Sequence, residues 1–306
     1  MSQEPNLTKG ILLAVGGVGL FSLKAIVVKL AYQSGISTLP LMTLRMLFSL
    51  PIYIALGSYW WQQGVIKPAK LKSNWLAIAG TGCLGYYLAS FLDLTGLNYI
   101  NAQLERLVLF AYPTFTVLIG GLLFKQLQGR ALKDLLWLLP ITWSGVALMA
   151  IYDWQQAGAD VWLGTLLVAI AAFVFAFYMI FSKPLIAKVG SKAFTCVAMS
   201  GASLAILAHY LIMAPISELF NQPQQVYIYG LIIAIFCTVI PSFMVSEAIK
   251  IVGPQRTAVT GSAGPIITAI VAVVVLDEAF TIYHFTGTAL VVGAVTWMAL
   301  RGRRAS

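Results

Sequence analysis

The sequence predicts an all-α integral membrane protein with ten transmembrane helices, arranged as two inverted five-helix repeats. Three observations predict this class. Of the 306 residues, 60% are hydrophobic and only 9% are charged, whereas about a quarter of the residues in a soluble domain carry a charge. Apolar runs of about 20 residues, the length that crosses a bilayer as a helix, recur along the whole chain. Basic residues gather in alternate links between these runs, which is typical of a multi-pass protein.

Ten apolar runs are long enough to span the bilayer. A closed β-barrel is the other structure that satisfies every backbone group in lipid, but it needs short segments of alternating polarity. Runs such as ITAIVAVVVL, at 267–276, do not alternate, so we expect helices. In chain order the predicted spans are 8–32, 38–61, 75–97, 102–124, 134–152, 161–186, 192–215, 226–249, 256–276 and 280–300.

The distribution of Lys and Arg predicts the orientation. Of the 19 basic residues, 15 lie at the N-terminus, at the C-terminus or in the links on the same side as these ends. The other links hold no basic residue and carry the acids Asp153, Asp160, Glu218, Asp277 and Glu278. The excess of basic residues marks the cytoplasmic side, so both termini are expected in the cytoplasm. The net charge of +9 therefore reflects topology, and no nucleic-acid partner is expected.

An internal repeat divides the chain into two units, 1–152 and 153–306. A shift of 152 positions places Ser90-Phe91 on Ser242-Phe243, Gln103 on Gln255 and Pro113 on Pro265. Because five spans is an odd number, the second unit must enter the membrane from the opposite side. Inverted repeats of this kind recur in secondary transporters, with the substrate site near the midplane at the repeat interface. Chance matching between helix-rich segments is the alternative interpretation.

Several stretches resemble a known family. FSLKAIVVKLAYQSG at 21–35, LDLTGLNYINAQLERLVLFAYPTF at 92–115 and SEAIKIVGPQRTAVTGSAGPIITAIVAVVVLDEAF at 246–280 are similar to the EamA-type family of the drug/metabolite transporter superfamily. The resemblance covers nearly the whole chain. It implies ten helices in two inverted five-helix repeats, a central cavity, and movement of small solutes by alternating access. It does not indicate which solute is moved.

Besides Lys29, five charged residues lie within the spans of the first repeat, in the half of the membrane away from the termini. They are Lys24, Arg45, Asp93, Glu105 and Arg106. A shift of 154 positions, which also places Gly10 on Gly164, aligns Lys24 and Arg45 with Tyr178 and Met199. The shift of 152 aligns the other three with Val245, Thr257 and Ala258, so all five counterparts are uncharged. A charge facing lipid at the helix centre costs at least about 2.5–3.5 kcal/mol, so these side chains should face protein or water.

Three interpretations of these charges are open. Asp93, Glu105 and Arg106, together with Arg45, can form a buried network that holds three helices together. Lys24 or Arg45 can instead be the surplus cation that meets a carboxylate or phosphate of a substrate, since ionisable groups at depth mark solute pathways. Proton coupling through Asp93 or Glu105 is the third interpretation.

Four further residues are candidates for the wall of the solute pathway. Tyr86 lies two turns before Asp93 and is expected either to line an aromatic pocket or to pack in the core. Tyr112 recurs at helical spacing with Glu105. Pro113 and Pro265, at matched positions, are expected to kink their helices beside the cavity, because proline removes one backbone hydrogen bond.

The sequence thus predicts a secondary transporter in a bacterial-type inner (plasma) membrane. Its partners are the lipid bilayer and a small polar metabolite, such as an amino acid or another anionic or zwitterionic solute. The family resemblance favours export. A membrane sensor or assembly protein without transport is one alternative, and a membrane-embedded enzyme is another. No catalytic residue, metal-ligand set or cofactor is predicted, so the chain is not expected to be an enzyme.

Overall fold

The structure, a computed structural model, describes residues 7–123, 130–261 and 263–302, and these form helices without a strand. Seven helical segments among them are long and apolar enough to cross a membrane. They are Leu7–Gln33, Thr38–Gln62, Trp75–Gly96, Ala102–Gly121, Asp160–Val189, Ser191–Met213 and Gln224–Val252. A shorter apolar helix spans Ala263–Leu276. The predicted all-helical, multi-pass class is therefore confirmed.

The first half of the chain forms helices over each predicted span. They are α1 (Leu7–Gln33), α2 (Thr38–Gln62), the run of α4 (Trp75–Gly82), η1 (Cys83–Leu88) and α5 (Ala89–Gly96), the pair α6 (Ala102–Leu109) and α7 (Tyr112–Leu123), and α8 (Arg130–Ala157). The five-residue α3 (Pro68–Lys72) lies in the link between α2 and α4. The end of the fourth predicted span, at 124, falls outside the described residues.

The second half follows the same order. Its helices are α9 (Asp160–Val189), α10 (Ser191–Met213), α11 (Ser217–Phe220), the run of α12 (Gln224–Ala234), η2 (Ile235–Val239) and α13 (Ile240–Val252), the pair α14 (Pro254–Thr260) and α15 (Ala263–Leu276), and α16 (Ile282–Gly302). The fifth, ninth and tenth predicted spans, on α8, α14–α15 and α16, are not among the seven segments that meet the length and hydropathy requirement.

The helices are interrupted at matching places in the two halves. η1 and η2 are π-helical segments that begin at Cys83 and Ile235, which are 152 positions apart. α6 ends at Leu109, four residues before Pro113, and the proline ring clashes with the carbonyl at that spacing. Pro265 is the third residue of α15, and α14 ends five residues before it, at Thr260. Pro113 and Pro265 therefore both lie in the first turn of a helix, after the preceding helix has ended.

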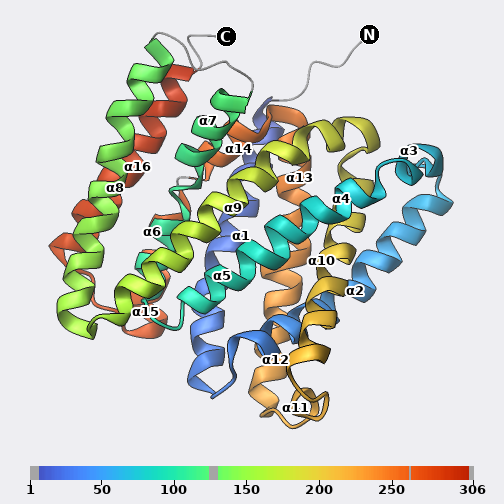
Figure 1. Ribbon diagram of the computed structural model, residues 1–306, viewed down its shortest axis with the longest axis horizontal. Coiled ribbons are helices and arrows are strands. Elements are labelled where there is room, and N and C mark those ends of the chain that lie inside the picture. The colour runs from blue at the N-terminus through green and yellow to red at the C-terminus, as the bar shows by residue number, and fades with distance from the viewer. Residues whose placement is uncertain (1–6, 124–129, 262, 303–306) are drawn as a thin grey trace.

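The two halves interleave. The most extensive helix contacts join α8 to α16, α1 to α13 and α15, α2 to α10, and α5 to α9, and each of these pairs takes one helix from each half. Figure 1 shows α8 and α16 side by side at one edge and α1, α9 and α13 in the middle, and it shows that α1 begins and α16 ends at the same end of the bundle. The core that positions the site therefore lies between the halves.

Candidate functional site

A cavity of about 80 Å³ lies between the two halves, which is room for several water molecules. Six of the predicted site residues line it: Lys24, Arg45, Tyr86, Asp93, Arg106 and Tyr112. Glu105 is fully buried beside Arg106 and does not line it. Pro113 and Pro265 do not line it either, although Tyr112 and Gly264, the residues before them, do.

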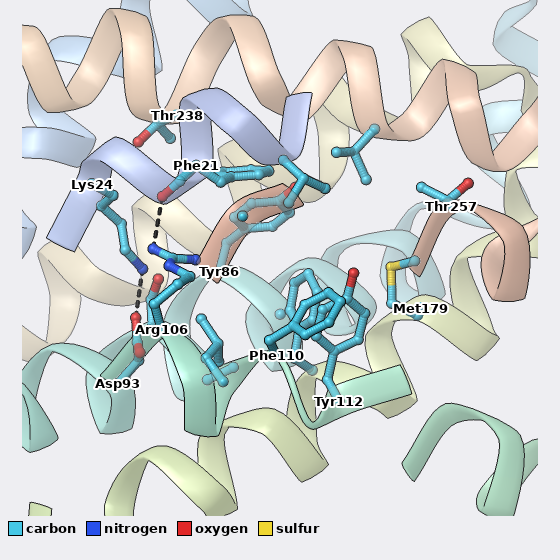
Figure 2. Close-up of a pocket in the computed structure, with 18 of the residues that line it drawn as sticks. Phe21, Lys24, Tyr86, Asp93, Arg106, Phe110, Tyr112, Met179, Thr238 and Thr257 are labelled. Atoms are coloured by element: carbon cyan, nitrogen blue, oxygen red, sulfur yellow. Dashed lines mark hydrogen bonds and ion pairs between the residues drawn. The ribbon is translucent and has the colours of Figure 1, made fainter. Parts of the chain in front are cut away.

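Lys24 and Asp93 form a buried ion pair at one end of the cavity. The Lys24 Nζ lies 2.5 Å from Asp93 Oδ2, and both side chains are almost fully buried. The pair joins α1 to α5, and Figure 2 draws it as a dashed line. The predicted network joined Asp93 to Arg45, Glu105 and Arg106 on the second and fourth predicted helices, whereas the structure pairs Asp93 with a lysine of the first.

Arg106 and Glu105 form a second pair in α6. The Arg106 Nε lies 3.6 Å from Glu105 Oε2, and Arg106 Nη2 donates a hydrogen bond of 2.8 Å to the carbonyl of Phe21. Since Phe21 belongs to α1, Arg106 also ties α1 to α6. The carboxyl group of Glu105 lies close to that of Asp93 as well. The two ion pairs are therefore one connected cluster at the same end of the cavity.

Arg45 differs from the other two cations, because no carboxylate lies within ion-pair distance of it in the described part of the chain. Its side chain is buried, with 2% of its surface exposed. It donates long hydrogen bonds of 3.3 Å to Ser90 Oγ and to the carbonyl of Tyr86. Its Nε, also buried, has no hydrogen-bond partner among the described residues. Arg45 is thus the surplus cation of the cluster.

Aromatic side chains form the middle of the cavity wall. Tyr86 contacts Tyr178 edge to face with ring centroids 5.1 Å apart, and Tyr112 contacts Phe175 in the same manner at 5.2 Å. Phe175 in turn stacks on Tyr178 at 5.3 Å. The edge-to-face and offset geometries are those that aromatic quadrupoles favour. These contacts make one continuous wall from η1 of the first half to α9 of the second.

The cavity is polar at one end and mostly apolar at the other. Figure 2 shows Lys24, Asp93 and Arg106 together on one side of it, and Met179 and Thr257 on the opposite side. The charged end comes from the first half of the chain. Met179 and Thr257 come from the second half, and Thr257 occupies the position that corresponds to Glu105 in the first.

Other polar contacts join the two halves at the end of the bundle opposite to the start of α1. The carboxylate of Glu278, between α15 and α16, accepts hydrogen bonds from the backbone N–H groups of Ala102 (2.7 Å) and Gln103 (3.2 Å) at the start of α6. Asn101, the N-cap of α6, donates to Asp153 at 2.7 Å. We call these five residues, Asn101, Ala102, Gln103, Asp153 and Glu278, the latch.

Sequence reasoning missed the latch and part of the cavity wall. Glu278 and Ala102 are far apart in the chain, and their contact follows from helix packing. Phe175 and Met179 could have been found, because they flank Tyr178, the position that corresponds to Lys24. At the end of α13, Lys250 Nζ lies 2.8 Å from Glu247 Oε1, in an ion pair between residues three positions apart.

Comparison with known proteins identifies the family. A model of the EamA-like transporter family matches residues 8–131 and 162–300. The chain belongs to this EamA-like family. The family resemblance inferred from the sequence is confirmed, and the protein is a multi-pass membrane transporter.

Relatives of this EamA-like protein carry transporter names. It is 27% identical to "Uncharacterized transporter YcbK" of Bacillus subtilis (strain 168), over 98% of this chain and 96% of that protein. It is 23% identical to "Uncharacterized transporter sll1319" of Synechocystis sp., over 82% and 76% of the two chains. A solved crystal structure matches with a TM-score of 0.67 over 98% of this chain and 99% of the other, at 16% identity. At that identity the structural match supports the fold alone.

Proposed function

We propose that this protein is a secondary transporter that moves a small polar metabolite, anionic or zwitterionic, across the inner membrane by alternating access. The observation that carries the proposal is the buried cavity between the two halves, with the guanidinium of Arg45 beside it and no carboxylate of the described residues within ion-pair distance of that guanidinium. A buried unpaired charge is costly. A substrate anion that visits the cavity supplies the missing partner.

Two inverted five-helix repeats, 1–152 and 153–306, provide the two-fold architecture that alternating access uses. The matched π-helical segments η1 and η2 support this division, as do the matched breaks before Pro113 and Pro265. Separate matches of the family model to the two parts of the chain are also consistent with it. On this proposal the fifth, ninth and tenth predicted spans also cross the bilayer.

The proposed orientation has both termini in the cytoplasm, because 15 of the 19 Lys and Arg residues lie on that side. The latch then lies at the outer end. Its contacts join α6 of the first half to the α15–α16 link of the second, so they must break when the outer end opens. We propose export as the net direction, on the family resemblance. Solute exchange, an ion gradient or the gradient of the substrate itself would supply the energy.

Efflux from proteoliposomes tests the proposal. Vesicles that contain the purified protein are loaded with a mixed pool of amino acids and small organic acids, and the released solutes are measured by mass spectrometry. The wild type is expected to release one charged class faster than protein-free vesicles do. Arg45→Gln is expected to lose this release. Arg256→Gln is the matched control, because Arg256 is an exposed arginine outside the cavity.

The outcomes separate the parts of the proposal. Equal release by wild type and Arg45→Gln would place the substrate site elsewhere. No release of any solute from a broad pool by correctly folded wild type would refute transport of small polar metabolites.

A further inference from the structure

We propose that the cavity selects organic monoanions, with one carboxylate bound at Arg45 and an apolar body held against the aromatic wall. This inference rests on the proposed function, because it names the chemical class of the solute that occupies the same cavity. The proposed function allows zwitterions and polyanions as solutes, and the present inference excludes both classes.

The charge around the cavity favours a single negative charge. Within the cluster, Lys24, Arg45 and Arg106 contribute three positive charges, and Asp93 and Glu105 contribute two negative ones. Two ion pairs account for four of these groups, which leaves one positive charge. Lys29, a half-buried lysine of α1, lies near Glu278 as well as Glu105, and the charge of Glu278 balances it. With a bound monoanion, the net charge of the buried cluster and its ligand is zero. With a zwitterion this net charge stays at +1, and with a dianion it becomes −1. Uncompensated buried charge is disfavoured, so the monoanion is the best match.

The position of Arg45 fits a carboxylate. Its two terminal nitrogens make long bonds of 3.3 Å to neutral acceptors, Ser90 Oγ and the Tyr86 carbonyl. Its Nε has no partner among the described residues. A guanidinium binds a carboxylate through two parallel N–H···O bonds, which are shorter and stronger than bonds to neutral groups. A ligand carboxylate can therefore improve on the bonds that Arg45 makes to Ser90 and Tyr86.

The carboxylates of the cluster are a poor match for a ligand ammonium. Asp93 is already bound by Lys24 at 2.5 Å, and Glu105 faces Arg106 at 3.6 Å. An incoming ammonium would compete with these cations for the same groups. Asp93 Oδ1 is a buried acceptor without a hydrogen bond among the described residues, and it is the atom that a zwitterion would use. A zwitterion is therefore the competing ligand that the test must include.

The rest of the wall is suited to an apolar body. Five aromatic residues line the cavity: Phe21, Tyr86, Phe110, Tyr112 and Phe175. Their rings present mainly apolar surface to a ligand rather than several hydrogen-bonding groups that point to one place. A sugar or a nucleotide needs several hydrogen bonds to replace water. The cavity volume of about 80 Å³ also favours a compact ligand. The ring faces bind aliphatic or aromatic carbon through apolar burial.

Binding to the purified full-length protein in lipid nanodiscs tests the inference. The probes are 3-phenylpropanoate and hexanoate, as monoanions with apolar bodies. The comparison ligands are 3-phenylpropanamide without charge, phenylalanine as a zwitterion, benzylmalonate as a dianion, and acetate without an apolar body. Dissociation constants come from isothermal titration calorimetry, with wild type, Arg45→Gln and the control Arg256→Gln measured side by side.

We expect at least one of the two monoanions to bind about tenfold or more tightly than each comparison ligand, since one charge-assisted hydrogen bond is worth about that factor. Arg45→Gln should lose this preference, and Arg256→Gln should keep it. Tighter binding of phenylalanine or benzylmalonate, equal binding of the amide, or no binding of either monoanion would overturn the inference. If the binding results overturn the inference but the proteoliposomes release another class of solute, the proposed function stands without the inference. If a monoanion binds as expected and no solute is moved, the binding class stands and transport fails.

Discussion

Lys24 and Asp93 make the shortest ion pair among the described residues, at 2.5 Å, in a position from which water is largely excluded. Taking two charges out of water is costly, and the pair is retained because each ion satisfies the other. Removal of one partner leaves the other charge buried and uncompensated. Loss of one residue of the pair is therefore expected to destabilise the bundle more than loss of both.

Replacement of Lys24 by methionine tests this dependence. We expect Lys24→Met to lower the free energy of unfolding by about 3–5 kcal/mol, because it strands the Asp93 carboxylate. The double variant Lys24→Met with Asp93→Leu should recover most of the loss. Equilibrium unfolding in mixed micelles measures both. Lys188→Met, at an exposed lysine near the end of α9, is the control, and a double variant as unstable as the single one would contradict the account.

The sequence predicted which side chains are charged at depth, but not how they pair. Composition and span position were sufficient to single out Lys24, Arg45, Asp93, Glu105 and Arg106. Pairing depends on the rotation of each helix about its own axis, which the uniformly apolar sequence around these residues does not specify. For that reason the sequence left Lys24 and Arg45 as equal candidates for the surplus cation, and the structure shows Lys24 paired with Asp93.

The π-helical segment η1 places Tyr86 against the cavity and Gly85 against α9. A Cβ atom added at Gly85 would lie 2.5 Å from Cγ of Tyr178, which is far inside van der Waals contact. The absence of a side chain at Gly85 therefore lets the Tyr178 ring close the aromatic wall. Single-turn π segments of this kind are frequent at functional sites.

Two glycine substitutions in the run from α4 to α5 separate the effect of the Gly85–Tyr178 contact from the general effect of replacing a helical glycine by alanine. Gly85→Ala is expected to lower the free energy of unfolding by about 1–3 kcal/mol through overpacking, and to weaken solute binding as the Tyr178 ring shifts. Gly80→Ala is the control, because an added Cβ there meets nothing within 4 Å, and it should be neutral or slightly stabilising. Equal effects of the two substitutions on unfolding would refute the role given to Gly85.

The latch holds the start of α6 to the α15–α16 link through the carboxylate of Glu278. Glu278→Gln removes the charge that strengthens both bonds. We expect hydrogen–deuterium exchange of the amides at 102–106 to become about tenfold faster, the factor that corresponds to one charge-assisted hydrogen bond.

Asp160→Asn serves as the control for the latch, because Asp160 is an exposed acid in the first turn of α9. It should leave exchange at 102–106 unchanged. Unaltered exchange in Glu278→Gln would mean that helix packing, rather than the latch, keeps this end closed.

Helix interruptions were partly predictable. Pro113 and Pro265 indicated where the fourth and ninth predicted helices break, because proline cannot continue the hydrogen-bond ladder of the preceding turn. The π-helical segments were not predicted. Both lie within continuous apolar runs, and the hydrophobic pattern of a π-turn in a membrane helix is the same as that of an α-turn.

The molecule as a whole is an all-helical membrane protein whose two halves share one cavity. Hydropathy and charge distribution predicted this class, and the family match confirms it. The interleaving of the halves, with α1 against α13 and α15 and with α2 against α10, could not be read from spans and loops. It depends on side-chain packing between helices that are far apart in sequence.

The central claim is that one cavity is reached alternately from the two sides of the membrane. Its most direct test uses Thr238→Cys, at the cavity wall, in a background without Cys83, Cys196 and Cys237. A membrane-impermeant maleimide is added to one side of oriented vesicles at a time. Ser203→Cys, fully buried outside the cavity, is the control and should stay unmodified. The account predicts modification of the Thr238→Cys thiol from each side, slowed by a transported solute. Modification from one side only, by protein that still transports, would contradict it.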